Sequence, residues 1–77
     1  MKDEKNKYPL YGFAERLKLA RHKKGIGKKK LCSRVGISRE SLSNYEGGYS
    51  TPNLTIVAKL AKELDVSLDY LAYGKQG

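Results

Sequence analysis

The sequence predicts an all-α protein, a compact five-helix bundle, and three observations support this prediction. Apolar residues recur at three- and four-residue intervals from Phe13 to Leu71, which is the spacing of a buried helix face. Glycine and helix-capping serine separate the periodic stretches. Nowhere does an alternation of apolar and polar residues long enough for a β-strand appear.

The length allows a single domain. The chain has 77 residues, of which we expect 1–11 to form an N-terminal arm, 12–74 the helical domain and 75–77 a short tail. A domain of this size buries about 60% of the surface that its unfolded chain exposes, so its core contributes only about 3–5 kcal/mol. A large enclosed active site is therefore not expected.

The first two predicted helices, over residues 12–24 and 28–35, are joined by a short glycine-containing turn. Each has one apolar face, formed by Phe13, Leu17 and Ala20 in the first helix and by Leu31, Cys32 and Val35 in the second. Gly25 is suited to end the first helix, because glycine readily adopts the left-handed conformation.

The third predicted helix spans residues 39–47 and follows the second through the connection Val35-Gly36-Ile37-Ser38. Ser38 is a preferred N-cap residue, and Gly48 follows the helix as its terminator. A short connection that contains glycine is what a tight turn between two crossed helices requires.

Two further helices are predicted over residues 53–64 and 68–73. The earlier one has the most regular apolar pattern in the chain, formed by Leu54, Val57, Ala58, Leu60, Ala61 and Leu64. In the last helix we expect Leu68 and Leu71 to face inward, with Ser67 as its N-cap.

Positive charge is concentrated in one block of the chain. Sixteen Lys and Arg residues stand against eight Asp and Glu, which gives a formal net charge of +8. From Arg16 to Arg39 there are ten basic residues and no acidic one, whereas residues 40–77 carry three basic and five acidic residues. Such a block attracts polyanions by long-range steering and counterion release. Nucleic acid is the leading partner, and an anionic membrane surface or a merely solvated basic face are the alternatives.

Several other classes of protein find no support in the sequence. The longest aliphatic run has three residues, Ile56-Val57-Ala58, so we expect no membrane span, and the N-terminus lacks a secretory signal pattern. Cys32 is the single cysteine and cannot form an intramolecular disulfide, which favours the reducing cytoplasm. One cysteine and one histidine are too few for a structural zinc site. No nucleophile–base pair indicates an enzyme, and no cofactor is implied.

The third predicted helix has a polar outer face. At about 100° per residue, Leu42 and Tyr45 point inward, and Glu46 lies within about 40° of Leu42. The outer side chains are Arg39, Glu40, Ser43 and Asn44. Arginine can bond guanine, asparagine adenine and glutamate cytosine in the major groove of DNA. We therefore predict that these four side chains read bases, with an ordinary solvated helix face as the alternative.

A series of residues at fixed spacings supports the same interpretation. It comprises Arg16-Leu17, Ala20-Arg21, Gly25-Ile26, Leu31 to Ser38, Leu42 to Gly48, Pro52, Leu54, Leu60-Ala61, Leu64, Val66 to Asp69, Leu71 and Gly74. This series resembles the lambda-repressor-like helix-turn-helix domains of the Cro/CI or xenobiotic-response-element type. The resemblance implies a five-helix domain that binds operator DNA, commonly as a dimer, with the third helix in the major groove.

Three positions depart from the pattern of that family. Lys28 stands where the family often has a glutamine that binds a phosphate, which a lysine can bind as a point charge. Cys32 replaces the usual alanine between the two helices, and we expect it to pack as a small apolar residue rather than to sense redox state. Asp65 replaces the glycine after the fourth helix and tolerates the left-handed conformation.

Phosphate contacts are expected beside the base-reading helix, because DNA-binding proteins usually divide positioning contacts from reading contacts in this way. The candidates are Lys28, Lys29, Ser41, Tyr49, Ser50 and Thr51. In similar domains, residues at the positions of Arg21 and Glu46 form a partly buried ion pair, which would fix the pose of the third helix.

We expect a homodimer that pairs through the C-terminal end of the domain, which is locally acidic and carries Leu68, Tyr70, Leu71 and Tyr73. The basic block must stay free for DNA. The predicted function is therefore a sequence-specific double-stranded DNA-binding regulator, a transcriptional repressor of the cytoplasm. The alternative is a protein-interaction module on the same fold, such as the antitoxin of a toxin–antitoxin pair, with a small protein partner.

Overall fold

The computed structural model describes residues 12–75, and this part of the chain forms five α-helices without a β-strand. Their bounds are Phe13–Lys24 for α1, Lys28–Val35 for α2, Arg39–Gly47 for α3, Leu54–Leu64 for α4 and Leu68–Tyr73 for α5. The predicted all-α, five-helix fold is confirmed. The predicted N-terminal arm lies outside the described residues, as does most of the predicted tail.

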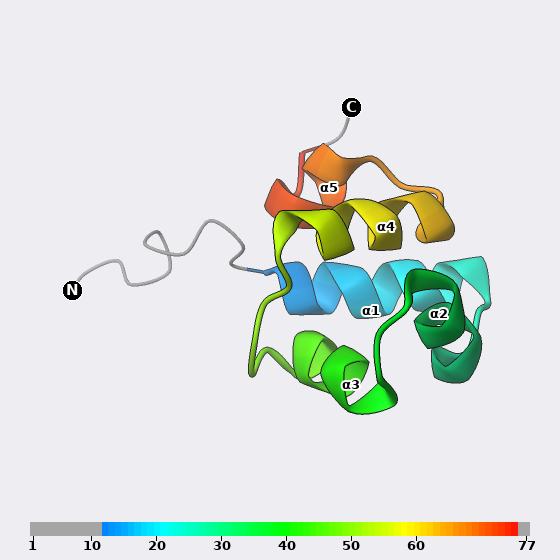
Figure 1. The fold of residues 1–77 in the computed structure, drawn as a ribbon. Coiled ribbons are helices and arrows are strands. Elements are labelled where there is room, and N and C mark those ends of the chain that lie inside the picture. The colour runs from blue at the N-terminus through cyan, green and yellow to red at the C-terminus, as the bar shows by residue number, and fades with distance from the viewer. Residues whose placement is uncertain (1–11, 76–77) are drawn as a thin grey trace.

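Helix α1 runs through the middle of the bundle. It contacts α3 on one side and α4 and α5 on the other, and α2 packs against both α3 and α4. Figure 1 shows this arrangement, with α4 and α5 above α1 and with α2 and α3 below it. The pair α2–α3 is therefore supported by α1 and α4, while the outer sides of α2 and α3 remain open.

Every helix contributes to one shared core. The largest fully buried side chains are Phe13 and Leu17 of α1, Leu31 of α2, Leu42 of α3, Leu60 of α4 and Leu71 of α5. Burying one such side chain stabilises a fold by about 1.5–3 kcal/mol. Because each helix depends on the same core, the orientation of α2 and α3 is fixed together with the rest of the domain.

Side-chain caps fix the start of three helices. Ser38, Asn53 and Ser67 each accept a hydrogen bond from the backbone N–H three residues further along the chain. A cap of this kind contributes about 1 kcal/mol. The sequence had suggested that Asn53 is the first helical residue of α4. The structure shows that it is the N-cap and that the helix begins at Leu54. Asp65 follows α4 in the left-handed conformation, with φ 62°, as predicted.

The structure corrects three of the predicted inward-facing positions. Leu54 is 70% exposed, and Ala58 is exposed as well. They lie about 70° and 110° round the helix from the centre of the buried face of α4, so neither reaches the core. Leu68, in the first turn of α5, is 38% exposed.

Candidate nucleic-acid interface

A three-residue turn joins α2 to α3 and sets the angle between them. Gly36 has φ 87°, which a residue with a side chain adopts only with strain. The N–H groups of Gly36 and Ile37 both donate to the carbonyl oxygen of Cys32, at 2.7 and 3.1 Å. Ile37 packs against the core, and the capping hydroxyl of Ser38 then begins α3. Both ends of the turn are thus fixed.

Helix α3 has one face in the protein and one in solvent. Leu42 and Glu46 are buried, and Tyr45, predicted to point inward, is half-buried against the core. The predicted base-reading residues are placed on the open side: Arg39, Glu40 and Ser43 are exposed, and Asn44 is half-buried. Hydrogen-bond donors and acceptors thus lie along the solvent side of α3, while the opposite side of the helix is packed against the core.

The N-terminus of α2 carries charges that oppose its own helix dipole. Its first three residues are Lys28, Lys29 and Lys30, its first turn has no acidic residue, and the N-cap Gly27 supplies no side-chain hydrogen bond. A cation at a helix N-terminus is unfavourable by roughly 0.3–1 kcal/mol. The same features suit an anion, because the uncapped N–H groups and the lysines both attract negative charge. Residues that are unfavourable for the stability of their own helix are typical of a binding site.

The predicted phosphate-contacting residues fall on two sides of α3. Lys28 and Lys29 lie at the start of α2, with Ser41 in the first turn of α3, where its hydroxyl accepts a hydrogen bond from Ser38 Oγ at 3.0 Å. Tyr49, Ser50 and Thr51 are exposed in the loop between α3 and α4. In Figure 1, α3 lies between α2 and this loop.

The start of that loop is bonded to α3. The N–H groups of Tyr49 and Ser50 both donate to the carbonyl oxygen of Asn44, at 2.9 and 3.4 Å, and the N–H of Gly48 donates to the Tyr45 carbonyl oxygen at 3.4 Å. These are the bonds of a Schellman motif, which closes the end of a helix. The backbone of Tyr49 and Ser50 is therefore tied to the predicted reader Asn44.

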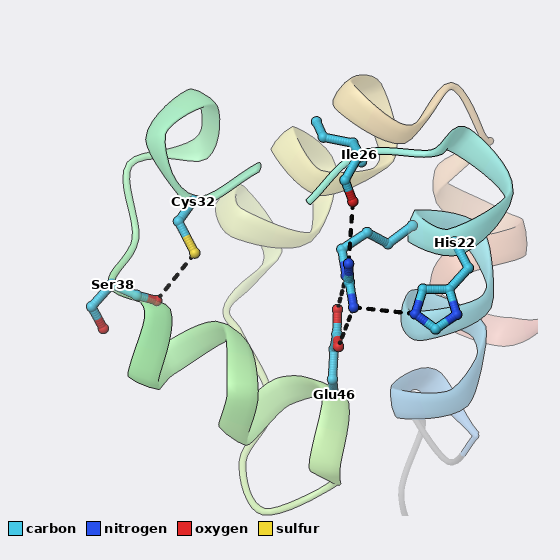
Figure 2. A network of polar contacts seen from close by, with 6 residues as sticks. His22, Ile26, Cys32, Ser38 and Glu46 are labelled. Carbon is cyan, nitrogen blue, oxygen red and sulfur yellow. Dashed lines mark hydrogen bonds and ion pairs between the residues drawn. The ribbon is translucent and has the colours of Figure 1, made fainter. Parts of the chain in front are cut away.

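A buried ion pair ties α3 to α1. Arg21 Nε donates to Glu46 Oε2 at 2.6 Å and Nη2 donates to Oε1 at 3.3 Å, while Nη1 donates to the Ile26 carbonyl oxygen at 3.1 Å (Figure 2). The His22 ring lies 3.3 Å from Nη2. Arg21 is 9% and Glu46 6% exposed. The structure thus brings together the two residues expected to pair, in a two-bonded geometry that fixes direction as well as distance.

Cys32 packs between α2 and α3. Its side chain is buried, and its Sγ donates a weak hydrogen bond to the Ser38 carbonyl oxygen at 3.5 Å (Figure 2). Burial raises the pKa of the Cys32 thiol above its ordinary value, against the opposing effect of the Arg39 charge. Because the thiolate is the reactive form, burial and the raised pKa both disfavour reaction at Cys32 and agree with the packing role expected from the sequence.

Two arginines have structural partners that the sequence did not reveal. Arg16 donates from Nε to the Leu71 carbonyl oxygen at 3.1 Å and from Nη2 to the Ala72 carbonyl oxygen at 2.8 Å. It thereby joins α1 to the C-terminal end of α5, where a cation is favourable. Arg34 lies 3.5 Å from Glu63 in an exposed pair between α2 and α4.

The predicted pairing surface is only partly open. Tyr73 is 56% exposed, Leu68 38% exposed, and Tyr70 half-buried. Leu71 is fully buried, so it belongs to the core rather than to any surface. The reason is geometric: a six-residue helix that packs against α1 and α4 must bury one side, and Leu71 is at its centre.

Neither a metal centre nor a membrane span is visible in the described part of the chain. Residues 12–75 contain no group of three or more His, Cys, Asp or Glu side chains that could hold a metal ion. Among the same residues, no helix is long and apolar enough to cross a membrane.

A compact helical bundle, a short glycine turn between two crossed helices and a polar outer face on the second of them define a helix-turn-helix protein. The chain belongs to this family: the family described as "Helix-turn-helix domain" matches residues 14–77.

Curated relatives come from Bacillus subtilis (strain 168). The chain is 39% identical over 62 residues to the SPbeta prophage-derived HTH-type transcriptional regulator YonR, covering 80% of this chain and 57% of YonR. It is 40% identical over 59 residues to the HTH-type transcriptional regulator ImmR, covering 77% of this chain and 46% of ImmR. The chain thus spans about half the length of the curated relatives that it matches.

Solved structures show the same fold. The P22 c2 repressor, solved in complex with a synthetic operator, superimposes with a TM-score of 0.77 at 33% identity, over 82% of this chain and 96% of the repressor chain. The restriction-modification controller protein C.AhdI from Aeromonas hydrophila gives a TM-score of 0.74 at 31% identity, over 80% of this chain and 94% of the controller.

Proposed function

We propose that the protein is a sequence-specific double-stranded DNA-binding transcriptional regulator, a repressor, that places α3 in the major groove. The observation that carries this proposal is the open polar face of α3 beside the uncapped, lysine-rich start of α2. The similar P22 c2 repressor binds an operator, and the relatives YonR and ImmR are transcriptional regulators. Such a regulator acts at the chromosome, so we place it in the cytoplasm, with no enzymatic activity and no cofactor.

The contacts divide into reading and positioning. The reading set consists of Arg39, Glu40, Ser43 and Asn44 on the open side of α3. The positioning set consists of Lys28, Lys29, Ser41, Tyr49, Ser50 and Thr51, together with the backbone N–H groups that begin α2. Because the positioning set flanks α3 on both sides, it would hold the helix against the base edges in one register.

The reading set is tested by selecting the preferred duplex from a random-sequence pool and measuring binding of two variants. Asn44→Ala and Arg39→Ala should each weaken binding to that duplex by about 1–3 kcal/mol. Binding to unrelated duplex should change little for Asn44→Ala, because no charge is lost. Thr55→Ala, on the exposed side of α4, is the control and should bind as the wild type does. If both reader variants bind the selected duplex normally, α3 is not the reading element.

We propose further that the protein pairs as a homodimer through α5 and the end of α4. The surface left after the correction of Leu71 comprises Leu68, Tyr70 and Tyr73. One domain contacts about one half-site, which limits its affinity. Two domains on a two-fold axis would place their α3 helices about 34 Å apart on a palindromic site.

The variant Tyr70→Glu with Tyr73→Glu should be monomeric in sedimentation, because two carboxylates would have to be buried at the interface. Its helical circular dichroism signal should remain. Leu19→Glu changes another exposed apolar side chain, on α1, and should leave the dimer intact. A wild type that is monomeric at tens of micromolar and also on its operator would contradict the proposed pairing.

A further inference from the structure

Gly47 is an unexpected residue at the end of α3. It lies within the helix, and it is absent from the described residues that have a positive φ. The presence of glycine at position 47 is therefore not explained by a left-handed backbone conformation. In the middle of a helix a glycine costs roughly 0.5–1 kcal/mol relative to alanine, and at this last residue of α3 alanine would still be the better helix former. Another feature of the structure must explain its presence.

The ring of Tyr49 occupies the space that a side chain at position 47 would need. A methyl group built on Gly47 would lie 2.7 Å from Cε2 and 2.9 Å from Cδ2 of Tyr49. Both distances are well below ordinary carbon–carbon contact, which is about 3.5–4.0 Å. The ring thus lies directly against the backbone of α3, although Tyr49 as a whole is 84% exposed. Only a glycine at position 47 permits this packing.

The backbone of Tyr49 cannot move away to compensate. Its N–H donates to the carbonyl oxygen of Asn44 at 2.9 Å, as part of the bonds that close α3. With the backbone held there, the open space above Gly47 lets the ring lie against α3, and this packing favours one direction of the phenol hydroxyl. A side chain added at position 47 would turn the ring by rotation about its Cα–Cβ bond.

We infer that Gly47 is a positioning residue for DNA binding, which acts by seating the Tyr49 ring so that its hydroxyl donates to a backbone phosphate of the bound duplex. The inference rests on the proposed DNA-binding function and deepens it. In this inference the Tyr49 ring is already positioned before DNA binds, and its hydroxyl does not have to be ordered by the contact with phosphate. It also links this phosphate contact to Asn44, whose carbonyl oxygen anchors the same residue.

The seating can be tested without DNA. In the NMR spectrum of the wild type, nuclear Overhauser effects should connect the α protons of Gly47 to the ring protons of Tyr49. These effects should persist in Tyr49→Phe, which keeps the ring. In Gly47→Ala, the corresponding effects between the α proton at position 47 and the ring should weaken or vanish. Absence of the effects in the wild type overturns the inference, whatever the binding data show.

Binding to the selected duplex tests the consequence. Loss of one hydrogen bond to a charged phosphate should weaken binding about ten- to a hundredfold in Tyr49→Phe. Gly47→Ala should cause a similar loss without lowering the unfolding midpoint, and the double variant should bind no more weakly than Tyr49→Phe alone. A normal affinity for Gly47→Ala or for Tyr49→Phe would overturn the inference. So would a Gly47→Ala loss that is undiminished in the Tyr49→Phe background, since the new methyl group would then clash with DNA directly.

Ala58→Gly is the matched control for helix propensity. It makes the opposite exchange at an exposed position of α4 that belongs to none of the proposed contact sets. It should lower the unfolding midpoint and leave the affinity unchanged. A wild type that binds every duplex equally and weakly would instead contradict the proposed function, whereas the Overhauser effects would still report the position of the ring.

Discussion

Replacing Glu46 by glutamine should destabilise the domain by about 3 kcal/mol, because it removes the carboxylate that is bonded to the buried guanidinium of Arg21. The amide can still accept from Arg21 Nε, but its NH2 group would face Nη2, which also donates. A domain of this size is stabilised by only about 3–5 kcal/mol, so about 0–2 kcal/mol should remain, and between a few per cent and about half of the population should be unfolded at room temperature. Urea denaturation followed by circular dichroism measures the change.

The chain supplies its own control in the exposed pair of Arg34 and Glu63. The distance between the charged atoms is 3.5 Å, and the Arg34 side chain is 52% exposed. Exposed pairs contribute about 0–1 kcal/mol, so Glu63→Gln should have little effect on the free energy of unfolding. Equal destabilisation by Glu46→Gln and Glu63→Gln would show that burial does not strengthen the inner pair.

A double replacement separates stability from orientation. Arg21→Met with Glu46→Leu removes both buried charges, and such exchanges are often neutral or stabilising. The variant should recover most of the lost stability. We expect it to bind its preferred duplex less tightly than the wild type, because the bonds from Arg21 to Glu46 fix the rotation of α3 against α1 in a way that apolar contacts do not. Full recovery of both properties would show that the pair has no role in orienting α3.

Local geometry made most of the fold predictable from the sequence. Helix ends follow from capping serines and glycines, and the two faces of α3 follow from the angle per residue. The same reasoning over-assigned α4, where six apolar residues were read as one face. Only four of them are buried, on the side of α4 that faces α1, α2 and α5, namely Val57, Leu60, Ala61 and Leu64. Leu54 and Ala58 are exposed to solvent.

Contacts between distant parts of the chain were harder to predict. Arg16 bonds to carbonyl oxygens 55 and 56 residues away, so no local pattern around it indicates its partner. It looked like one more cation of the basic block. Leu71 was expected to face inward and was also included in the pairing surface; the packing of α5 on α1 and α4 buries it, which confirms the first expectation and contradicts the second. The seating of Tyr49 on Gly47 likewise depends on side-chain packing that spacing alone does not specify.

Binding to the preferred duplex should weaken steeply as salt concentration rises. If each monomer neutralises five or six phosphates, the logarithm of the binding constant should fall with the logarithm of salt concentration with a slope of about −5, and about twice that for a dimer. A fourfold rise in salt concentration should then weaken binding of a monomer about a thousandfold. Fluorescence anisotropy at several salt concentrations measures the slope.

Two lysine pairs distinguish a local contact from the effect of net charge. Lys28→Ala with Lys29→Ala should weaken all duplexes about equally and make the slope shallower by about 2 per monomer, because two phosphate contacts are lost. Lys59→Ala with Lys75→Ala removes the same charge from α4 and from the second residue after α5, and should leave the slope nearly unchanged. If the two double variants behave alike, overall charge drives binding and the start of α2 is not a phosphate site. A flat salt response with retained binding would refute the electrostatic contribution as a whole.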